Sequence, residues 1–245
     1  MEEKEVNVYK IESVKDRVID NSYVGRGIIV GKSADGKNAV FAYFIMGRSE
    51  NSRNRIFVEN GDDITIYPYD ESKVEDPSLI IYSPVRACKN SVIVTNGDQT
   101  DTVYDFVTEG KTFEEALRTR EFEPDRPNFT PRISAIMDFD GGYSYKMSIL
   151  KSEDAEGSAC TRQFFEYLPL NGLGHFIHTY NCDGNPIPTF TGEPERVAIP
   201  NDINEFAREI WTSLNENNKI SLAVRYIPLD GGKAEQVVIN KFKKV

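Results

Sequence analysis

The sequence contains few of the residues from which metal centres and disulfide scaffolds are built. Its cysteines are the widely spaced Cys88, Cys160 and Cys182, and its histidines are His175 and His178. No Cys-x-x-Cys pair exists, which excludes a zinc ribbon and a dithiol redox motif. Because residues i and i+3 of a strand face opposite ways, the two histidines make a poor metal clamp. We therefore predict no metal site and no cofactor.

Long apolar runs and excess positive charge are also missing. No run of ~20 apolar residues exists to cross a bilayer, and the start, Met1-Glu2-Glu3-Lys4, lacks the apolar stretch of a signal peptide. Lysine and arginine number 29 against 39 acidic residues, a formal net charge of −10. This balance argues against nucleic-acid and membrane partners, which attract basic surfaces, and we expect a cytoplasmic protein. A small phosphorylated ligand stays compatible, because a few arginines in a cleft dominate the local field.

Apolar segments separated by Asp-Gly and Gly-Gly turns predict an antiparallel protein. Hairpins are expected at 27–31 with 39–46, 133–139 with 143–150, and 220–227 with 237–242. Further strands are predicted at 64–67, 79–82, 91–95, 160–168 and 175–180, and helices at 102–107, 114–118 and 203–214. Few helices among many hairpins favour an α+β fold in which sheet packs on sheet with helices outside. We expect one domain over residues 1–245, with 1–21 as either an extension or a first strand–helix piece.

An arginine-rich loop follows the strand predicted at 39–46. It carries Arg48, Arg53, Asn54 and Arg55, and Arg26 lies near the start of an earlier strand. Guanidinium groups bind phosphate oxygens through paired hydrogen bonds. Its place at a strand end favours an anion site. The alternative is a solvated basic loop, which is more common for the bare pattern.

Two shorter features could also contribute to a site. The turn Thr95–Asp101 contains Asn96 and Gly97, where backbone can approach a ligand closely at a helix start. Its alternative is an ordinary helix cap. Tyr82 could act as a phenol donor, although a half-buried strand aromatic is the more common case.

The Pro-rich stretch 123–132 is too irregular for a helix or strand. Long irregular loops in compact domains are often functional, and this one carries Glu123, Asn128, Thr130 and Arg132. The equally supported alternative is a rigid connector in which Arg132 pairs with Asp125.

These segments together resemble the archaeal-type IMP cyclohydrolase family. The resemblance is carried, in this order, by Tyr-Val-Gly-Arg-Gly-Ile-Ile-Val-Gly-Lys at 23–32, Arg48-Ser49…Asn54-Arg55, Tyr82…Arg86, Asn96-Gly97, and Glu-Pro-Asp-x-Pro-Asn-x-Thr-Pro-Arg-Ile at 123–133. It covers about residues 23–180, and the last motif is the most specific. The residues before 23, the added Arg53 and the charged region 150–160 depart from the family pattern.

The resemblance implies a fold and a reaction. The fold is a four-layer αββα sandwich of mainly antiparallel sheets, similar to N-terminal-nucleophile hydrolases, although Met1-Glu2 offers no terminal nucleophile. The reaction is that of a hydrolase of purine biosynthesis. It closes the ring of 5-formamidoimidazole-4-carboxamide ribotide to give inosine monophosphate and water, with no cofactor. A purine ribotide is then the ligand, and a homo-oligomer is compatible with the sequence.

The resemblance also implies roles for individual residues. Glu123 corresponds to the catalytic carboxylate, Tyr82 to the catalytic phenol, and Arg48 or Arg55 to the catalytic arginine. Substrate binding is expected from Arg26, Arg53, Asn54, Asn96, Gly97, Asn128, Thr130 and Arg132. The alternatives are a non-catalytic purine-ribotide-binding paralogue and a structural paralogue. The joint presence of Glu123, Tyr82 and the arginines favours the enzyme.

The scarcity of metal-ligating residues gives a first prediction. Protein treated with a chelator should keep its full rate of ring closure, followed by ultraviolet absorbance. A loss of rate that only a divalent metal ion restores would contradict it.

Overall fold

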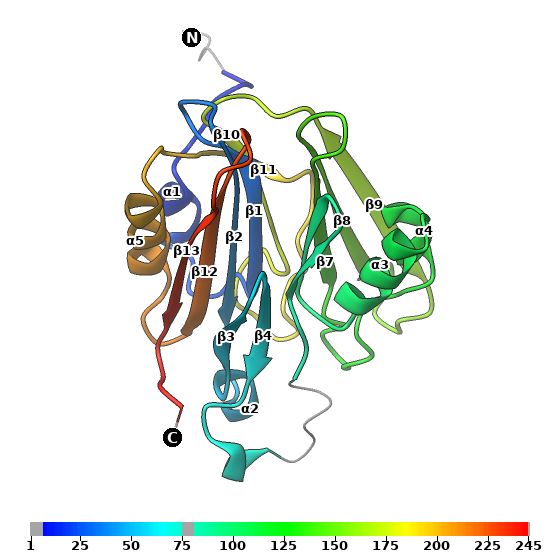
Figure 1. Ribbon diagram of the computed structural model, residues 1–245. Coiled ribbons are helices and arrows are strands. Elements are labelled where there is room, and N and C mark those ends of the chain that lie inside the picture. The colour runs from blue at the N-terminus through cyan, green and yellow to red at the C-terminus, as the bar shows by residue number, and fades with distance from the viewer. Residues whose placement is uncertain (1–6, 75–80, 245) are drawn as a thin grey trace, which may run out of the picture.

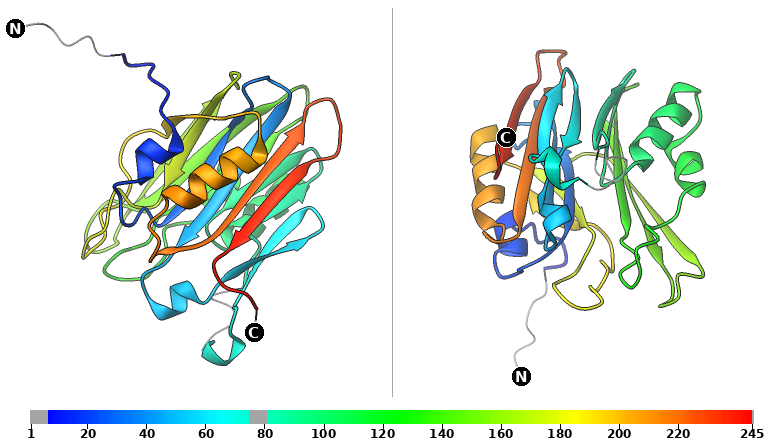
Figure 2. Two further views of the ribbon diagram at one scale, coloured as in Figure 1. Left: turned by 90° about the vertical axis from the view of Figure 1, so that its left-hand side faces the viewer. Right: turned by 90° about the horizontal axis from the view of Figure 1, so that it is seen from below.

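The computed structural model describes residues 7–74 and 81–244, and its helices cover the outer faces of two stacked sheets (Figure 1). Helices α1 (Val14–Val18) and α5 (Ile203–Ser213) lie on one side, and α3 (Gln99–Thr108) and α4 (Phe113–Arg118) on the other. The view from below shows the order helix, sheet, sheet, helix (Figure 2). The predicted α+β fold with sheet packed on sheet is therefore confirmed.

Both sheets are antiparallel throughout. The six-stranded sheet has the order β11 (Glu195–Ala198), β10 (Leu173–His178), β1 (Arg26–Lys32), β2 (Asn38–Met46), β12 (Lys219–Pro228), β13 (Glu235–Asn240). The seven-stranded sheet follows chain order: β3 (Ile56–Asn60), β4 (Asp63–Tyr67), β5 (Val85–Cys88), β6 (Ser91–Thr95), β7 (Arg132–Asp138), β8 (Ser144–Ser152), β9 (Cys160–Tyr167). The short helix α2 (Glu50–Arg53) connects β2 to β3, and the 3₁₀ turn η1 (Glu71–Lys73) lies between β4 and β5 in sequence.

The alternation of side chains along β2 explains how this strand joins two cores. Phe41, Tyr43 and Ile45 face the second sheet, whereas Ala42 and Phe44 face the layer of α1 and α5. Successive residues of a strand point to opposite faces, and a strand covered on both faces is apolar without interruption. This is why residues 39–46 are apolar without a break.

Helix α5 forms where its amphipathic pattern predicts. Asp202 caps it by accepting the Glu205 backbone N–H at 2.8 Å, and Ile203, Phe206 and Ile210 are buried against the six-stranded sheet. Residues before 23 contribute α1, whose Val14 and Val18 join the same core. None of the helices in the described residues is long and apolar enough to cross a membrane.

The three predicted hairpins and helix α4 are confirmed, but other expectations need correction. Helix α3 starts at Gln99 rather than at 102, because Thr100 turns its hydroxyl to the Gly97 carbonyl at 2.9 Å inside the first turn. Strands β3, β5 and β11 were not predicted. The predicted strand at 79–82 falls partly outside the described residues, and its residues 81–82 form no strand.

His175 and His178 point to opposite faces of β10, as predicted. The His175 Nδ1 atom shares a 2.7 Å hydrogen bond with the Tyr145 hydroxyl of the other sheet, and its ring stacks on Tyr167 with centroids 3.6 Å apart. Burial, assisted by the charge of Arg196, lowers the pKa of His175 to about 4. The folded protein therefore keeps this ring neutral where an exposed histidine becomes charged.

This burial predicts an acid-sensitive contribution to stability. Between pH 6.5 and 4 the unfolded chain protonates position 175 and the folded chain does not, so stability falls as pH falls through this window. We expect the wild type to lose about 2 kcal/mol more than His175→Gln between pH 7.5 and 4.5, with partial solvent screening included. Urea unfolding of both proteins at the two pH values measures it, and equal losses would contradict it.

Candidate active site

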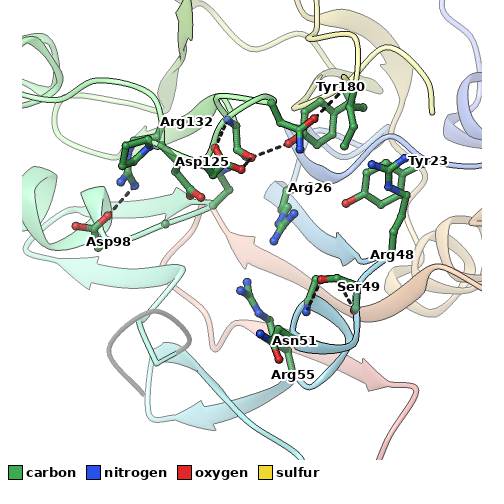
Figure 3. Close-up of a pocket in the computed structure, with 18 of the residues that line it drawn as sticks. Tyr23, Arg26, Arg48, Ser49, Asn51, Arg55, Asp98, Asp125, Arg132 and Tyr180 are labelled. Atoms are coloured by element: carbon green, nitrogen blue, oxygen red, sulfur yellow. Dashed lines mark hydrogen bonds and ion pairs between the residues drawn. The ribbon is translucent and has the colours of Figure 1, made fainter. Parts of the chain in front are cut away.

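A cavity of about 740 Å³ opens where strand ends of both sheets meet (Figure 3). Arg26 begins β1 and Tyr180 follows β10 in the six-stranded sheet, while Asn96 follows β6 and Arg132 begins β7 in the seven-stranded sheet. In antiparallel sheets the start of one strand lies beside the end of its neighbour, so distant motifs meet at this edge. The volume is typical of small-molecule sites.

Most of the residues predicted from the sequence line this cavity: Arg26, Arg48, Arg55, Tyr82, Asn96, Gly97, Glu123, Asn128, Thr130 and Arg132. Arg53 and Asn54 do not. The Arg53 guanidinium donates to the Gly47 carbonyl and to Asn218, each at 3.1 Å. The Asn54 amide exchanges hydrogen bonds with the Asp70 backbone. Both residues hold the arginine-rich loop in place, in contrast with the prediction that they bind substrate.

Arg26 and Arg55 lie in the cavity without a protein counter-ion. Among the described residues, neither side chain forms a hydrogen bond or an ion pair, and the Arg55 Nε atom is buried without a partner. Burial and the nearby charge of Arg26 lower the pKa of Arg55. Burial opposes the charge on Arg26 as well, but nearby tyrosines and Glu123 raise its pKa above the ordinary value. The centre of the cavity is therefore positively charged.

Glu123 brings a carboxylate into this field. Its backbone N–H donates to the Thr130 carbonyl at 2.9 Å, which fixes the loop, and its Oε1 lies close to Gly97. Burial raises the pKa of Glu123, against the opposing pull of Arg26 and Arg132. A carboxyl group with a raised pKa in a cleft can both accept and return a proton near neutral pH.

The Tyr82 hydroxyl lies at the end of a short polar chain. It donates to the Asn96 carbonyl at 2.7 Å, and the Tyr43 hydroxyl lies 3.5 Å away. Because a carbonyl only accepts, the Tyr82 proton points to Asn96, and any hydrogen bond between the two phenols is donated by Tyr43. Tyr82 is thus held in a fixed orientation at the cavity wall.

The Asn96 side chain is fully engaged within the protein. Its Nδ2 donates to the Pro131 carbonyl at 2.8 Å, and its Oδ1 accepts from the Ile133 N–H and from Gln99, each at 2.9 Å. Asn96 therefore joins β6 to the start of β7. It offers the cavity its backbone rather than the amide that the sequence analysis assigned to substrate.

Arg132 is paired with Asp98, not with Asp125 as the rigid-connector alternative proposes. Its Nη1 lies 2.6 Å from Asp98 and 2.7 Å from the Gln99 side-chain oxygen. A Cβ atom on Gly97 would lie 2.6 Å from both the Arg132 Nη1 atom and the Gln99 side-chain oxygen, so any larger residue would displace this hydrogen-bonded pair. The glycine is needed for this close approach.

The loop 123–132 is held by its own polar groups. Asp125 accepts from the Thr130 backbone at 2.6 Å and from its hydroxyl, and that hydroxyl lies 2.7 Å from the Tyr180 hydroxyl. Asn128 accepts from the Ile187 N–H at 3.0 Å. Thr130 and Asn128 thus connect the loop to the segment after β10.

Arg48 lies at the edge of the cavity. Its guanidinium pairs with Asp183, donates to the Gly184 carbonyl at 3.0 Å, and lies over the Tyr23 ring at 5.1 Å. The exposed fraction is 36% for the Arg48 side chain and 43% for the Asp183 side chain. Surface pairs of this kind contribute little stability, so an anionic ligand could replace Asp183 at low cost.

The sequence analysis missed several lining residues: Tyr23, Ser49, Asn51, Ser52, Asp98, Pro124, Tyr180 and Ile187. Most of them lie inside the motifs at 23–32, 48–55, 95–101 and 123–133, so the motifs could have predicted that these residues lie near the site. Tyr180 and Ile187 come from the segment after β10, which has no such pattern. Within the described chain, no group of three or more acidic, cysteine or histidine residues could hold a metal ion.

Comparison with known proteins supports the sequence resemblance. The family model described as "IMP cyclohydrolase-like protein" matches residues 23–232. An IMP cyclohydrolase of Methanocaldococcus jannaschii is 26% identical over 86% of this chain and 96% of its own length. IMP cyclohydrolases of Methanococcus aeolicus and Methanopyrus kandleri are 28% and 32% identical over 65% and 64% of this chain, and 75% of each relative.

The bonding of Asn96 predicts a structural role for its side chain. Asn96→Leu should lower the free energy of unfolding by about 3 kcal/mol, because the Pro131 carbonyl and the Ile133 N–H lose their partner in a buried place. Asn51→Leu is the matched control, since Asn51 is an exposed lining residue, and should change it by less than about 0.5 kcal/mol. Urea unfolding measures both; unchanged stability of Asn96→Leu would contradict the role.

Proposed function

We propose that this chain, which belongs to the IMP cyclohydrolase-like family, closes the imidazole carboxamide ring of a formamido ribotide to give inosine monophosphate. The observation that carries the proposal is Glu123, a carboxyl group of raised pKa, in one cavity with two guanidinium groups that form no ion pair with any residue the structure describes. That arrangement offers a proton shuttle beside a site for developing negative charge. The names of the related proteins support the same reaction.

The ligand class follows from the charge of the cavity. A ribotide carries a phosphate dianion, and arginines in the cavity attract it although the whole protein has a net charge of −10. Arg48 at the edge, whose counter-ion Asp183 is exposed, is suited to exchange that partner for a phosphate oxygen. The volume of about 740 Å³ accommodates a nucleoside monophosphate.

Ring closure needs two proton transfers. The carboxamide nitrogen attacks the formyl carbon, a carbon–nitrogen bond forms, and the formyl oxygen becomes negative. Glu123 enters as a carboxylate, takes a proton from the nitrogen and passes it to that oxygen. The resulting carbinolamine then loses its hydroxyl group with a proton as water, while the former formamide nitrogen gives up its proton and forms the carbon–nitrogen double bond. The wall of the cavity must hold the two arms of the substrate close together.

Tyr82 and Arg55 act on the oxygen in this proposal. Rotation about its carbon–oxygen bond moves the Tyr82 proton from the Asn96 carbonyl to the formyl oxygen, while the Tyr43 hydroxyl supports the phenol. Of the two arginines that the resemblance left open, Arg55 is the better partner for the oxygen, because it lies within the electrostatic range of both Tyr82 and Glu123. A preorganised donor of this kind typically contributes about 10²–10³-fold in kcat.

We also propose that the four-layer sandwich is related to N-terminal-nucleophile hydrolases and that it acts as one domain in the cytoplasm. The proposed reaction does not need a terminal nucleophile, because the Glu123 carboxylate inside the cavity moves the proton. A homo-oligomer stays a prediction.

The first experiment mixes the purified protein with the formamido ribotide and follows ultraviolet absorbance. Ring closure is expected. Retention of inosine monophosphate without any ring closure would replace the enzyme with a ribotide-binding protein.

The sharpest variant is Glu123→Gln, which keeps size and hydrogen bonding but cannot exchange a proton. We expect kcat to fall by about 10²–10⁴-fold, with little change in nucleotide affinity and melting temperature. Glu121→Gln, two residues away and exposed, is the matched control and should keep full activity. A lowered melting temperature with full activity of Glu123→Gln would make Glu123 a loop anchor and leave the reaction without its base.

A further inference from the structure

The four arginines of the cavity divide into two kinds. Arg132 pairs with Asp98 and Arg48 pairs with Asp183. Arg26 and Arg55 have no ion pair or side-chain hydrogen bond with any other described residue, and Figure 3 shows Arg26 at the centre of the lining, between the Asp125–Tyr180 side and the Asn51–Arg55 side. Of the two arginines without a partner among the described residues, Arg26 is thus central and Arg55 lies to one side of it.

The backbone of Arg26 is fixed on both sides by glycines. Gly25 has a φ of +76°, and a Cβ atom there would lie 2.0 Å from the Thr179 hydroxyl. A Cβ atom on Gly27 would lie 2.3 Å from the Phe44 ring. The Arg26 N–H donates to Thr179 at 3.1 Å, and its carbonyl accepts from Thr179 at 3.0 Å. The strand therefore aims this side chain into the cavity from a rigid base.

Arg55 is fixed by its neighbour. Asn54 is buried, and its amide makes two hydrogen bonds to the Asp70 backbone at 2.8 and 2.9 Å. The Arg55 Nε atom is buried and has no partner among the described residues. Two like charges that are held near each other, partly buried and without side-chain partners among the described residues, are unfavourable. An anion between them removes both the repulsion and the missing hydrogen bonds.

The neighbours of this pair indicate which anion it holds. Tyr82 and Glu123 line the same cavity as both guanidiniums, and both meet at the turn of Asn96 and Gly97: the Tyr82 hydroxyl donates to the Asn96 carbonyl at 2.7 Å, and the Glu123 Oε1 atom lies close to Gly97. The charges of Tyr82 and Glu123 also act on the pKa of both guanidiniums. These are the groups that handle the reacting nitrogen and oxygen, whereas a phosphate lies at the other end of a ribotide. The pair thus faces the place where negative charge develops during ring closure. This step rests on the proposed function.

We propose that Arg26 is a catalytic residue, which together with Arg55 forms a two-guanidinium cradle for the formyl oxygen as the amide nitrogen attacks it. The oxygen gains its negative charge between the two side chains and loses it when Glu123 returns the proton. Arg48, at the edge, is left to hold the phosphate. This divides the arginines into a pair that stabilises the transition state and one that binds the substrate.

The test compares Arg26→Gln with Arg48→Gln, and with Arg208→Gln as the matched control, since Arg208 is exposed on α5 and does not line the cavity. We expect Arg26→Gln to lower kcat by about 10²–10³-fold with little change in KM. Arg48→Gln should raise KM by at least about tenfold, as for a lost charge-assisted hydrogen bond, and keep kcat. Arg208→Gln should keep both, and Arg26→Lys should fall between the wild type and Arg26→Gln.

A pH profile adds a readout that a structural role would not change. Glu123 is faced by Arg26 from β1, Arg55 from the loop before β3, Arg132 from β7 and Asp125 of its own loop. Removing the positive charge of Arg26 raises the pKa of Glu123, so the acid limb of kcat/KM moves to higher pH in Arg26→Gln. Arg48→Gln and Arg208→Gln should leave this limb in place.

Failure of the cradle is distinguishable from failure of the proposed function. No ring closure by the wild type would overturn the function. The binding ratio of inosine monophosphate to inosine, measured by calorimetry, then tests Arg26 separately. An unchanged ratio in Arg26→Gln supports its place away from the phosphate. A ratio that collapses, or a KM that rises with unchanged kcat, would make Arg26 the phosphate anchor and overturn the cradle.

Discussion

Positive charge without a direct ion pair, at the meeting edge of two sheets, is the constraint on which this site depends. Among the described residues the side chains of Arg26 and Arg55 form no ion pair or hydrogen bond, and burial of a guanidinium without such partners is unfavourable. The surrounding backbone keeps both side chains in place: Thr179 holds Arg26 from both sides and Asn54 holds the segment before Arg55. Both guanidiniums therefore keep their hydrogen-bond donors for an anionic ligand.

The buried amide of Asn96 connects the fold to this charged centre. It joins β6 to the start of β7, while the backbone carbonyl of Asn96 accepts a hydrogen bond from the Tyr82 hydroxyl. The same strand end carries Gly97, which leaves room for Arg132 and brings Glu123 close. A change at Asn96 would therefore reach the phenol, the carboxylate and Arg132 together. In the proposed reaction Asn96 therefore fixes the relative positions of these groups, although it contacts none of the reacting atoms itself.

Sequence pattern predicted the hairpins, helix α5 and the motifs that meet in the cavity, because alternation, turn residues and caps act locally. It could not separate Arg53 from Arg55, since both stand in one loop and only the tertiary contacts to Gly47 and Asn218 turn Arg53 away. It expected Asn96 to bind substrate for the same reason, since the backbone carbonyl that the Asn96 side chain binds lies 35 residues later in the chain. Tyr180 had no local signal, because its contact with Thr130 joins segments 50 residues apart.

The acidic surface and the arginine-lined cavity are consistent with each other. A net charge of −10 disfavours the approach of polyanions such as nucleic acids, while a small ribotide responds to the local field inside the cleft. Arg48 meets it first, at the edge, because its pair with Asp183 is exposed and is exchanged at low cost. Arg26 and Arg55 line the same cavity, are only partly exposed, and have no side-chain partner among the described residues. In the proposed mechanism the exposed Arg48 holds the phosphate, while Arg26 and Arg55 reserve their electrostatic interaction for the oxygen that becomes negative in the transition state.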